Sequence, residues 1–323
     1  MKALVTGVAG FVGSSIAARL LTDGHDVVGV DALTDYYATE LKRGNLARLD
    51  SPRFDLVEAD LNQLDLRALL DDVEVVFHEA GQPGVRDSWG TGFAPYTAHN
   101  IAATQALLEA ARHATRLTRF VYASSSSVYG EAESYPTRET DRPEPRSPYG
   151  VTKLAAEHLV TLYARGFGMP TTSLRYFTVY GPHQRPDMAF TRFLRAAIDG
   201  DPIRVFGTGE QVRDFTYIDD VVEANLRAAS VDHEPGSVFN VAGGGQVSVN
   251  EVLDIIEELA GHPLQVERVG AAAGDVSRTS GATELIAATL GWHATVPVAE
   301  GLRAQHAWAV EAAPMLARTI DWK

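Results

Sequence analysis

The sequence predicts an α/β fold in which a doubly wound parallel sheet is joined to a smaller mixed α/β domain. In the first half of the chain, short apolar stretches alternate with amphipathic helical patterns, which is typical of a parallel sheet covered by helices on both faces. After about residue 175 the alternation weakens, because Pro182, Pro186 and Pro202 interrupt it. The length of 323 residues also suggests two domains, at about 150 residues per domain.

The first half contains the clearest strand and helix patterns. The expected strands are Ala3–Thr6, Asp26–Asp31, Phe54–Glu58, Val73–His78, Arg119–Ser124 and Thr171–Tyr176. The expected helices are Phe11–Leu21, Leu64–Leu70, Tyr96–His113 and Tyr149–Arg165. In the second half, Ser248 and Glu251 have the spacing of a capping box, which predicts a helix that runs toward Gly261. Parallel sheets bind ligands at the carboxyl ends of their strands, so the segments after the strands are the candidate site.

The composition excludes several classes of function. The net charge of −14 argues against a nucleic-acid partner, because binding to phosphate backbones needs clustered positive charge. The chain has no cysteine, so it cannot form disulfides, use thiol catalysis or bind zinc through cysteine, and we expect no metal site. We find neither a signal peptide nor a membrane-spanning apolar run, and therefore expect a cytoplasmic protein with no membrane partner.

A glycine-rich turn follows the first expected strand and precedes the first expected helix. Gly7, Gly10 and Gly13 have the spacing G-x-x-G-x-x-G, one residue longer at the first gap than the usual dinucleotide motif. Glycine lets the backbone approach a pyrophosphate, and the helix N-terminus offers free N–H groups. Asp31 ends the second strand, where a carboxylate binds the adenosine-ribose hydroxyls and repels a 2′-phosphate. The pattern therefore predicts a dinucleotide site that favours NAD over NADP.

Residues after the third and fourth strands extend this site. Asp60 and Leu61 are placed to meet the adenine, and Ala80-Gly81 lacks the bulk that would keep a cofactor away. Asn100, in the next helix, either lies near the cofactor or only supports the sheet. His78 ends a strand and is expected to be a core histidine rather than a catalyst.

Tyr149 and Lys153 form a second candidate site. Lys153 is the one lysine between Lys42 and Lys323, in a chain with 28 lysine and arginine residues. In a helix, positions i and i+4 lie on one face, so the phenol and the ammonium are expected to be neighbours. A nearby ammonium favours the phenolate and lowers a tyrosine pKa from about 10 toward neutrality, which makes a general base.

Together these residues resemble the extended short-chain dehydrogenase/reductase family, within its nucleotide-sugar epimerase branch. The resemblance also covers Val121–Gly130, Leu174–Pro182 and Gly207–Asp220. It implies a Rossmann-like NAD-binding domain over residues 1–174, to which segments near 214–242 return, and a UDP-sugar-binding domain over residues 175–323. Residues 35–37 with 41–43, 82–86 and 185–190 resemble UDP-glucuronate 4-epimerases more narrowly.

The resemblance assigns roles to individual residues of this chain. Tyr149, Lys153 and Ser125 would be catalytic, with Ser125 sharing the sugar 4-hydroxyl with Tyr149. The NAD-binding residues would be Gly7, Gly10, Phe11, Val12, Gly13, Asp31, Arg43, Asp60, Leu61, Ala80, Gly81, Gln82, Asn100, Tyr149, Lys153 and Tyr176. The substrate-binding residues would be Arg86, Ser126, Ser127, Thr178, Arg185, Met188, Arg192, Phe206, Arg213, Asp275 and Arg278.

Within the substrate set, the resemblance separates three parts of the ligand. Ser126, Ser127 and Thr178 would meet the sugar carboxylate, which Arg185 would guard. Arg213 would hold the diphosphate, while Phe206 and Asp275 would border the uridine. Related enzymes often have a second phosphate arginine where this chain has Ala271 to Ala273, so Arg192, Arg268 or Arg278 would have to replace it.

The reaction implied is reversible C4 epimerisation of UDP-glucuronate to UDP-galacturonate by a homodimer, through a 4-keto intermediate and tightly bound NAD. Homologous dehydratases and decarboxylases carry acidic residues at the positions of Ser126 and Ser127, where this chain has only hydroxyls. The main alternative is 4-epimerisation of UDP-glucose or a UDP-N-acetylhexosamine. A UDP-glucuronate decarboxylase and a non-catalytic NAD-binding protein are the remaining alternatives.

Overall fold

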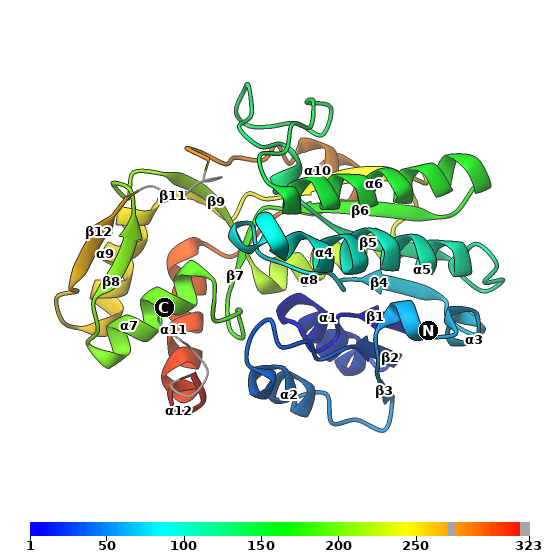
Figure 1. Ribbon diagram of the computed structural model, residues 1–323, viewed down its shortest axis with the longest axis horizontal. Coiled ribbons are helices and arrows are strands. Elements are labelled where there is room, and N and C mark those ends of the chain that lie inside the picture. The colour runs from blue at the N-terminus through cyan, green and yellow to red at the C-terminus, as the bar shows by residue number, and fades with distance from the viewer. Residues whose placement is uncertain (271–275, 317–323) are drawn as a thin grey trace.

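The computed structural model describes residues 1–270 and 276–316, and its centre is a seven-stranded sheet (Figure 1). The strands are β1 (Lys2–Thr6), β2 (Asp26–Asp31), β3 (Phe54–Glu58), β4 (Val75–His78), β5 (Arg119–Ser125), β6 (Thr171–Tyr176) and β10 (Ser237–Val241). Their spatial order is β10-β6-β5-β4-β1-β2-β3, and neighbouring strands are parallel. The order reverses between β1 and β4, and ligands of this fold bind at such a switch point.

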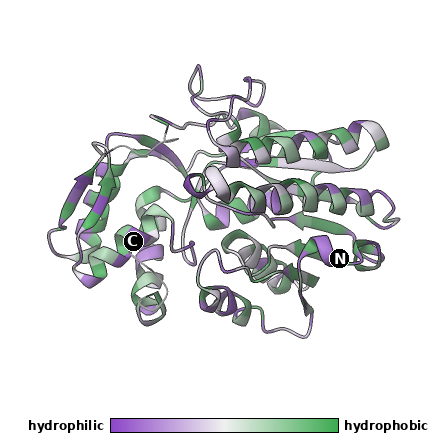
Figure 2. Cartoon of the chain, viewed as in Figure 1, coloured by the Kyte–Doolittle hydropathy of each residue, from purple (hydrophilic) through white to green (hydrophobic). Residues whose placement is uncertain are grey.

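Helices cover both faces of the sheet, because successive strand side chains point to opposite faces. One face is covered by α1 (Phe11–Thr22) and α8 (Ile218–Ser230), and the other by α3 (Leu66–Leu70), α5 (Ala103–Ala111) and α6 (Pro148–Phe167). In β1, for example, Val5 packs with the first group and Leu4 with the second. Hydrophobic and hydrophilic residues alternate along α5 and α6 accordingly (Figure 2). The doubly wound, Rossmann-like fold predicted from the sequence is confirmed.

A smaller lobe lies beyond the carboxyl ends of the strands, on the left of Figure 1. It contains a three-stranded sheet of β7 (Thr178–Tyr180), β9 (Val212–Tyr217) and β11 (Gln246–Ser248), and a pair formed by β8 (Ile203–Phe206) and β12 (Val266–Val269). Its helices are α7 (Ala189–Asp199), α9 (Val249–Ala260), α11 (Val298–Glu311) and α12 (Ala313–Leu316). A further helix, α10 (Glu284–Leu290), contacts β10.

One cluster of buried apolar side chains runs from the central sheet into the smaller lobe. It includes Val5 and Phe239 from the sheet, and Phe190, Phe215 and Leu302 from the lobe. The rings of Phe190 and Phe215 are 4.4 Å apart between centroids. The two parts of the molecule therefore share a core.

Several elements differ from the sequence prediction, three of them for a visible physical reason. The helix expected over Tyr96–His113 is present but is not a regular α-helix throughout, because a π-helical turn over Thr97–Ala102 connects α4 (Phe93–Tyr96) to α5. β4 starts at Val75 rather than Val73, because the Val73 N–H donates to Leu70 at the end of α3. The helix α2 (Thr39–Ala47) was not predicted, since its sequence is mostly polar and Leu41 is its one buried apolar residue.

The capping box predicted in the second half of the chain is confirmed. The helix α9 begins with the predicted capping box, in which the Glu251 N–H donates to Ser248 Oγ at 3.1 Å and the Ser248 N–H donates to Glu251. Within residues 1–270 and 276–316, the model has no helix that is long and apolar enough to span a membrane.

Candidate active site

A cavity of about 1080 Å³ lies between the strand ends of the central sheet and the smaller lobe. Its size is close to the upper end for pockets that hold cofactors and small ligands. Of the residues predicted from the sequence, the cavity is lined by Gly7, Gly10, Phe11, Val12, Gly13, Asp31, Asp60, Leu61, Ala80, Gly81, Gln82, Arg86, Ser125, Ser126, Ser127, Tyr149, Lys153, Tyr176, Thr178, Arg185, Met188, Arg192, Phe206 and Arg213. The fold thus brings together residues that are up to about two hundred positions apart in the chain.

The structure does not bring three predicted residues to the cavity wall. Asn100 is buried and makes two hydrogen bonds to the backbone of Gln82. The Gln82 N–H donates to Asn100 Oδ1 at 2.6 Å, and Asn100 Nδ2 donates to the Gln82 carbonyl at 3.1 Å. Asn100 therefore supports the cavity from behind. Arg43 is exposed and lies 3.7 Å from Glu58. Arg278 donates to Gln246 of β11 at 2.7 Å and is not among the residues that line the cavity. Asp275 lies outside the described residues.

The glycine-rich turn between β1 and α1 leaves no room for side chains. Gly7 has φ = +67°, and a Cβ there would lie 2.8 Å from the Ala80 nitrogen. A Cβ at Gly13 would lie 2.3 Å from the Gly7 carbonyl oxygen. The helix α1 begins after Gly10 without a side-chain cap, so its first N–H groups remain available at the cavity. This backbone cradle fits a phosphate group.

Gly13→Ala is expected to destabilise the protein by about 1–3 kcal/mol, because the new methyl group meets backbone rather than a movable side chain. The midpoint of urea unfolding measures the effect. Gly166→Ala in α6 is the matched control, since a Cβ there meets nothing within 4 Å and alanine favours helix. Equal midpoints for Gly13→Ala and the unmodified protein would show that the turn has spare room.

Asp31 is held by two backbone N–H groups at the end of β2. The Ala9 N–H donates to Oδ2 at 3.0 Å and the Leu33 N–H donates to Oδ1 at 2.8 Å. A carboxylate oxygen accepts more than one hydrogen bond, so both oxygens can still accept from ligand hydroxyls. Asp60 and Leu61 lie on the same wall of the cavity, after β3.

Tyr149 and Lys153 lie in the first two turns of α6, opposite the serines that follow β5. The helix is started by Ser147, whose Oγ accepts from the Gly150 N–H at 3.1 Å, and by Pro148 at its first position. Gly150 lets the helix approach the serines closely, because a Cβ there would lie 2.5 Å from the Ser127 carbonyl oxygen. Tyr149, Lys153 and Ser125 therefore line the same cavity.

The expectation that Lys153 lowers the Tyr149 pKa is not met in this structure. Burial has the largest effect and raises the pKa of Tyr149, while a side-chain interaction with Ser125 and the charge of Arg185 act in the opposite direction. Burial also lowers the pKa of Lys153 to about 8, because the residue is only 6% exposed. The prediction considered the attraction between the two groups and neglected the desolvation of each.

His78 is a core residue, as the sequence suggested. Its ring nitrogens lie 2.7 Å from Thr6 Oγ1 and 2.9 Å from Thr104 Oγ1, and burial lowers its pKa to about 3. The ring is therefore neutral and hydrogen-bonded on both sides.

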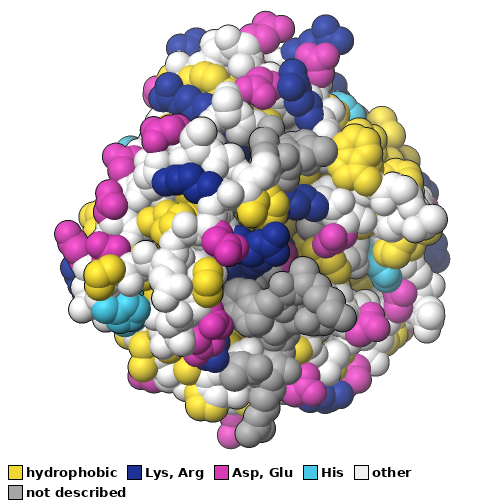
Figure 3. Space-filling model, turned by 60° about the vertical axis from the view of Figure 1, so that its left-hand side comes forward, with side chains coloured by type: hydrophobic (Ala, Val, Ile, Leu, Met, Phe, Trp, Pro, Cys, Tyr) yellow, Lys and Arg dark blue, Asp and Glu magenta, His cyan; other side chains and the backbone are white. Residues whose placement is uncertain are grey.

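Arginines gather on the side of the cavity that faces the smaller lobe. In Figure 3, where the left-hand side of Figure 1 is turned forward, Lys and Arg side chains lie near the centre of the view. The Arg86 guanidinium lies 4.1 Å from the centroid of the Phe206 ring, and Arg213 donates to the Val276 carbonyl at 2.7 Å. Burial, followed by the charges of Arg86 and Arg204, lowers the pKa of Arg192. Cations that repel one another in this way favour a polyanionic ligand.

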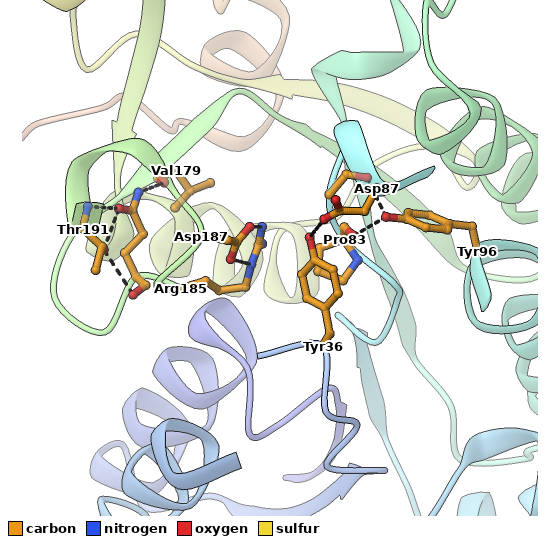
Figure 4. A network of polar contacts seen from close by, with 10 residues as sticks. Tyr36, Pro83, Asp87, Tyr96, Val179, Arg185, Asp187 and Thr191 are labelled. Atoms are coloured by element: carbon orange, nitrogen blue, oxygen red, sulfur yellow. Dashed lines mark hydrogen bonds and ion pairs between the residues drawn. The ribbon is translucent and has the colours of Figure 1, made fainter. Parts of the chain in front are cut away.

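Arg185 has an acidic partner inside the cavity (Figure 4). Its Nε and Nη2 donate to Asp187 Oδ1 and Oδ2, each at 2.9 Å. Nearby, Tyr36 donates to Asp87 at 2.8 Å, and Tyr96 donates to the Pro83 and Gly84 carbonyls. The Tyr36–Asp87 bond joins the loop after β4 to the segment before α2, while the Arg185–Asp187 pair lies within the segment before α7.

The sequence reasoning missed several residues of the cavity wall, among them Tyr36, Glu79, Asp187 and Arg204. Glu79 had a usable signal, because it stands between the strand β4 and the noted Ala80-Gly81. Burial raises the pKa of this carboxyl to about 7. Nothing in the sequence indicated that Arg204 belongs to the cavity, since an exposed strand position accepts any polar residue.

Comparison with known proteins agrees with this site. A model of the NAD dependent epimerase/dehydratase family matches residues 3–242. The uncharacterized UDP-glucose epimerase YtcB of Bacillus subtilis (strain 168) is 45% identical over 86% of this chain and 88% of its own length. A probable UDP-glucuronate 4-epimerase of Rhizobium meliloti (strain 1021) is 38% identical over 94% of this chain and 95% of its own.

A solved structure is similar over almost the whole chain. UDP-glucuronic acid 4-epimerase from Bacillus cereus, in complex with UDP-glucuronic acid and NAD, superposes with a TM-score of 0.93 at 40% identity, covering 96% of this chain and 99% of that one. The family model and these relatives cover well over half of the chain. The chain therefore belongs to the NAD dependent epimerase/dehydratase family.

Proposed function

We propose that this protein is an NAD-dependent UDP-sugar 4-epimerase that interconverts UDP-glucuronate and UDP-galacturonate through a 4-keto intermediate. The observation that carries the proposal is a single cavity that is lined by Tyr149, Lys153 and Ser125 together with the glycine-rich turn and a group of arginines. The names of the Rhizobium meliloti and Bacillus cereus relatives support this substrate.

The cavity fits NAD. The backbone at Gly7, Gly10 and Gly13 would hold the pyrophosphate, since a Cβ would fill that cradle, and Asp31 would accept from the adenosine-ribose hydroxyls. Asp60 and Leu61 would border the adenine, and Ala80, Gly81 and Tyr176 would line the nicotinamide end. When bound, NAD supplies the acceptor for the hydride of C4 and the donor that returns it.

Tyr149 would take the proton of the C4 hydroxyl, and Ser125 would hold that hydroxyl in place. Because burial raises the pKa of Tyr149, the phenolate needs a positive charge nearby. Lys153 follows one helical turn later, lines the same cavity and would supply that charge. The 4-keto sugar would then turn within the cavity, so that reduction on its other face inverts C4.

The hydroxyls of Ser126, Ser127 and Thr178 explain why the reaction would stop at epimerisation. All three residues line the cavity. A serine or threonine hydroxyl is a poor base at neutral pH, so this wall cannot remove the C5 proton as a carboxylate can. The three hydroxyls can instead donate to the sugar carboxylate, whose burial without donors would be costly.

Arg185→Ala is expected to weaken binding of UDP-glucuronate or to release a decarboxylated 4-keto pentose. Oxidation at C4 makes a β-keto acid, which loses CO₂ when its carboxylate bond lies perpendicular to the ketone plane. Arg185 would help to hold the carboxylate out of that alignment. To do so, it would give up its ion pair with Asp187. Product analysis by NMR measures the leak, and Arg204→Ala serves as an arginine control in the same cavity. Normal binding and no leak in Arg185→Ala would show that Arg185 does not contact the carboxylate.

The single most informative experiment is incubation of the purified protein with UDP-glucuronate, with the products followed by NMR. Appearance of the C4 epimer supports the proposal. UDP-glucose is the second candidate substrate, because the relative that is 45% identical is named a UDP-glucose epimerase. Competition between the two sugars decides between them. A protein that retains NAD but converts neither sugar would have a non-catalytic role.

We further propose a cytoplasmic homodimer, with residues 1–174 binding NAD and residues 175–323 contributing most of the UDP-sugar site. The outer face of α6 supports the dimer, because Val151 and Leu162 lie on the same side of the helix, about three turns apart, and are 48% and 59% exposed. Apolar side chains on one helix face favour burial against a second copy. Analytical ultracentrifugation tests this assembly.

A further inference from the structure

Glu79 is a buried carboxylate that the mechanism above does not use. It directly follows β4 and lines the cavity. Its Oε1 accepts from Tyr176 Oη at 2.9 Å, and Asn225 Nδ2 of α8 donates to the same phenol at 2.8 Å. This chain of hydrogen bonds, which runs from α8 through β6, fixes the Glu79 side chain on the cavity wall.

Lys153 carries a buried charge that needs compensation. Its ammonium lies 4.8 Å from the centroid of the Tyr122 ring and 3.8 Å from the position of a Cβ on Gly81, two residues after Glu79. Among residues 1–270 and 276–316, no carboxylate oxygen lies within the 4.0 Å of an ion pair with Lys153. A buried ammonium without an opposite charge tends to lose its proton.

Two carboxylates, Glu79 and Glu157, oppose that loss of the proton. Glu157 is already neutralised, because Arg175 Nη2 and Nε donate to its two oxygens at 2.6 Å and 2.9 Å. Ser124 also donates to Glu157 at 2.6 Å. Glu79 is therefore the carboxylate near Lys153 whose charge no arginine cancels.

We propose that Glu79 is a positioning residue whose carboxylate keeps the Lys153 ammonium charged at alkaline pH, and that it thereby sets the upper pH limit of catalysis. Glu79 acts through Lys153 rather than on the sugar. The proposal rests on the proposed function in one respect, namely that catalysis needs a charged Lys153.

The other titratable groups around Glu79 stay neutral in the relevant pH range. Burial raises the pKa of Tyr176 on β6 and of Tyr122 on β5 well above the usual value, and His78 on β4 has a pKa lowered to about 3. From α8 the contact is the amide of Asn225, and from the glycine-rich turn it is the backbone at Gly7. Glu79 and Lys153 are thus the groups that change charge near neutral pH.

The sign of the effect follows from the two pKa values. Burial raises the pKa of Glu79 to about 7, and Lys153 has a pKa lowered to about 8. Above pH 7 the Glu79 carboxylate is charged and stabilises the ammonium, which delays its deprotonation. Removing that negative charge therefore moves the deprotonation of Lys153 to lower pH.

The first test is a direct titration of Lys153 in Glu79→Gln. The chain has only four lysines, at positions 2, 42, 153 and 323, so ¹³C-labelled lysine gives a spectrum that is simple enough to assign with Lys153→Arg. In the NAD-bound protein, the midpoint of Lys153 is expected to fall by about one pH unit in Glu79→Gln. Glu79→Asp, which keeps the charge, should recover part of that shift. An unchanged midpoint in Glu79→Gln overturns the proposal.

The second test is the pH dependence of turnover. In Glu79→Gln, the alkaline decrease of kcat should move to lower pH by the same number of pH units as the lysine midpoint. At lower pH, the kcat of Glu79→Gln should approach that of the unmodified protein. A rate reduced by one factor at every pH would mean a purely structural role and would overturn the proposal. Glu258→Gln, on the exposed face of α9, is the charge-matched control. The lysine titration needs no sugar, so it decides the proposal even if UDP-glucuronate is not a substrate.

Discussion

Tyr149→Phe is expected to reduce turnover of UDP-glucuronate by about 10²–10⁴-fold, the usual loss when a general base is removed. The substitution deletes one oxygen and leaves the ring in its contact with Tyr96, where the ring centroids are 6.2 Å apart. Folding and NAD content should therefore remain normal. Steady-state rates at saturating substrate measure the effect, because the loss belongs in kcat rather than in KM.

The matched control for Tyr149→Phe is Tyr122→Phe. Tyr122 is 1% exposed, and its hydroxyl has no hydrogen-bond partner among the residues that the structure describes. Loss of that hydroxyl should leave turnover within a few-fold of the value for the unmodified protein. It should not lower stability, since a buried unpaired polar group is unfavourable. Activity of Tyr149→Phe close to that of Tyr122→Phe would remove Tyr149 from the mechanism.

Arg175→Leu is expected to have the largest effect on stability, a loss of about 3–5 kcal/mol. Arg175 and Glu157 form a two-fold hydrogen-bonded ion pair between β6 and α6, with side-chain exposures of 5% and 3%. Removal of the arginine leaves a buried carboxylate without a counter-charge and also breaks the 2.7 Å bond from Arg175 to Tyr129. Urea unfolding followed by circular dichroism measures the loss.

Arg53→Leu provides the comparison for Arg175→Leu. Arg53 pairs with Asp26 at 3.0 Å, but the two side chains are 53% and 55% exposed. Water screens such a pair, so its loss should change stability by less than about 1 kcal/mol. If Arg53→Leu and Arg175→Leu lowered the free energy of unfolding by the same amount, burial would not explain the importance of Arg175.

The sequence predicted most of the central sheet and the two main site motifs because both depend on local patterns. The bounds that the apolar stretches predicted for β2, β3 and β6 are the observed ones. The glycine spacing and the Tyr149–Lys153 interval were informative, because each motif needs particular residues at fixed separations along one element. The structure then placed both motifs on one cavity.

The features that the sequence did not predict depend on contacts between distant segments. The direction of the Tyr149 pKa shift follows from burial, and burial is set by elements that close over α6. The pairing of Arg185 with Asp187 and the position of Arg204 depend on how the smaller lobe meets the sheet. The strand β10 pairs with β6 from the second half of the chain, and this return to the sheet near residues 214–242 was implied by the family resemblance rather than by a local pattern.

The apolar cluster shared by the sheet and the smaller lobe makes the molecule a single cooperative unit. A fragment ending at residue 174 would lack β10 and would expose the sheet side chains that now belong to the same cluster as Phe190 and Phe215. Ligands that enter the cavity touch both parts, so their binding energy stabilises the whole chain by mass action. Entry and release of a nucleotide sugar would then depend on displacement of rim segments such as the loop after β4, rather than on separation of two independent bodies.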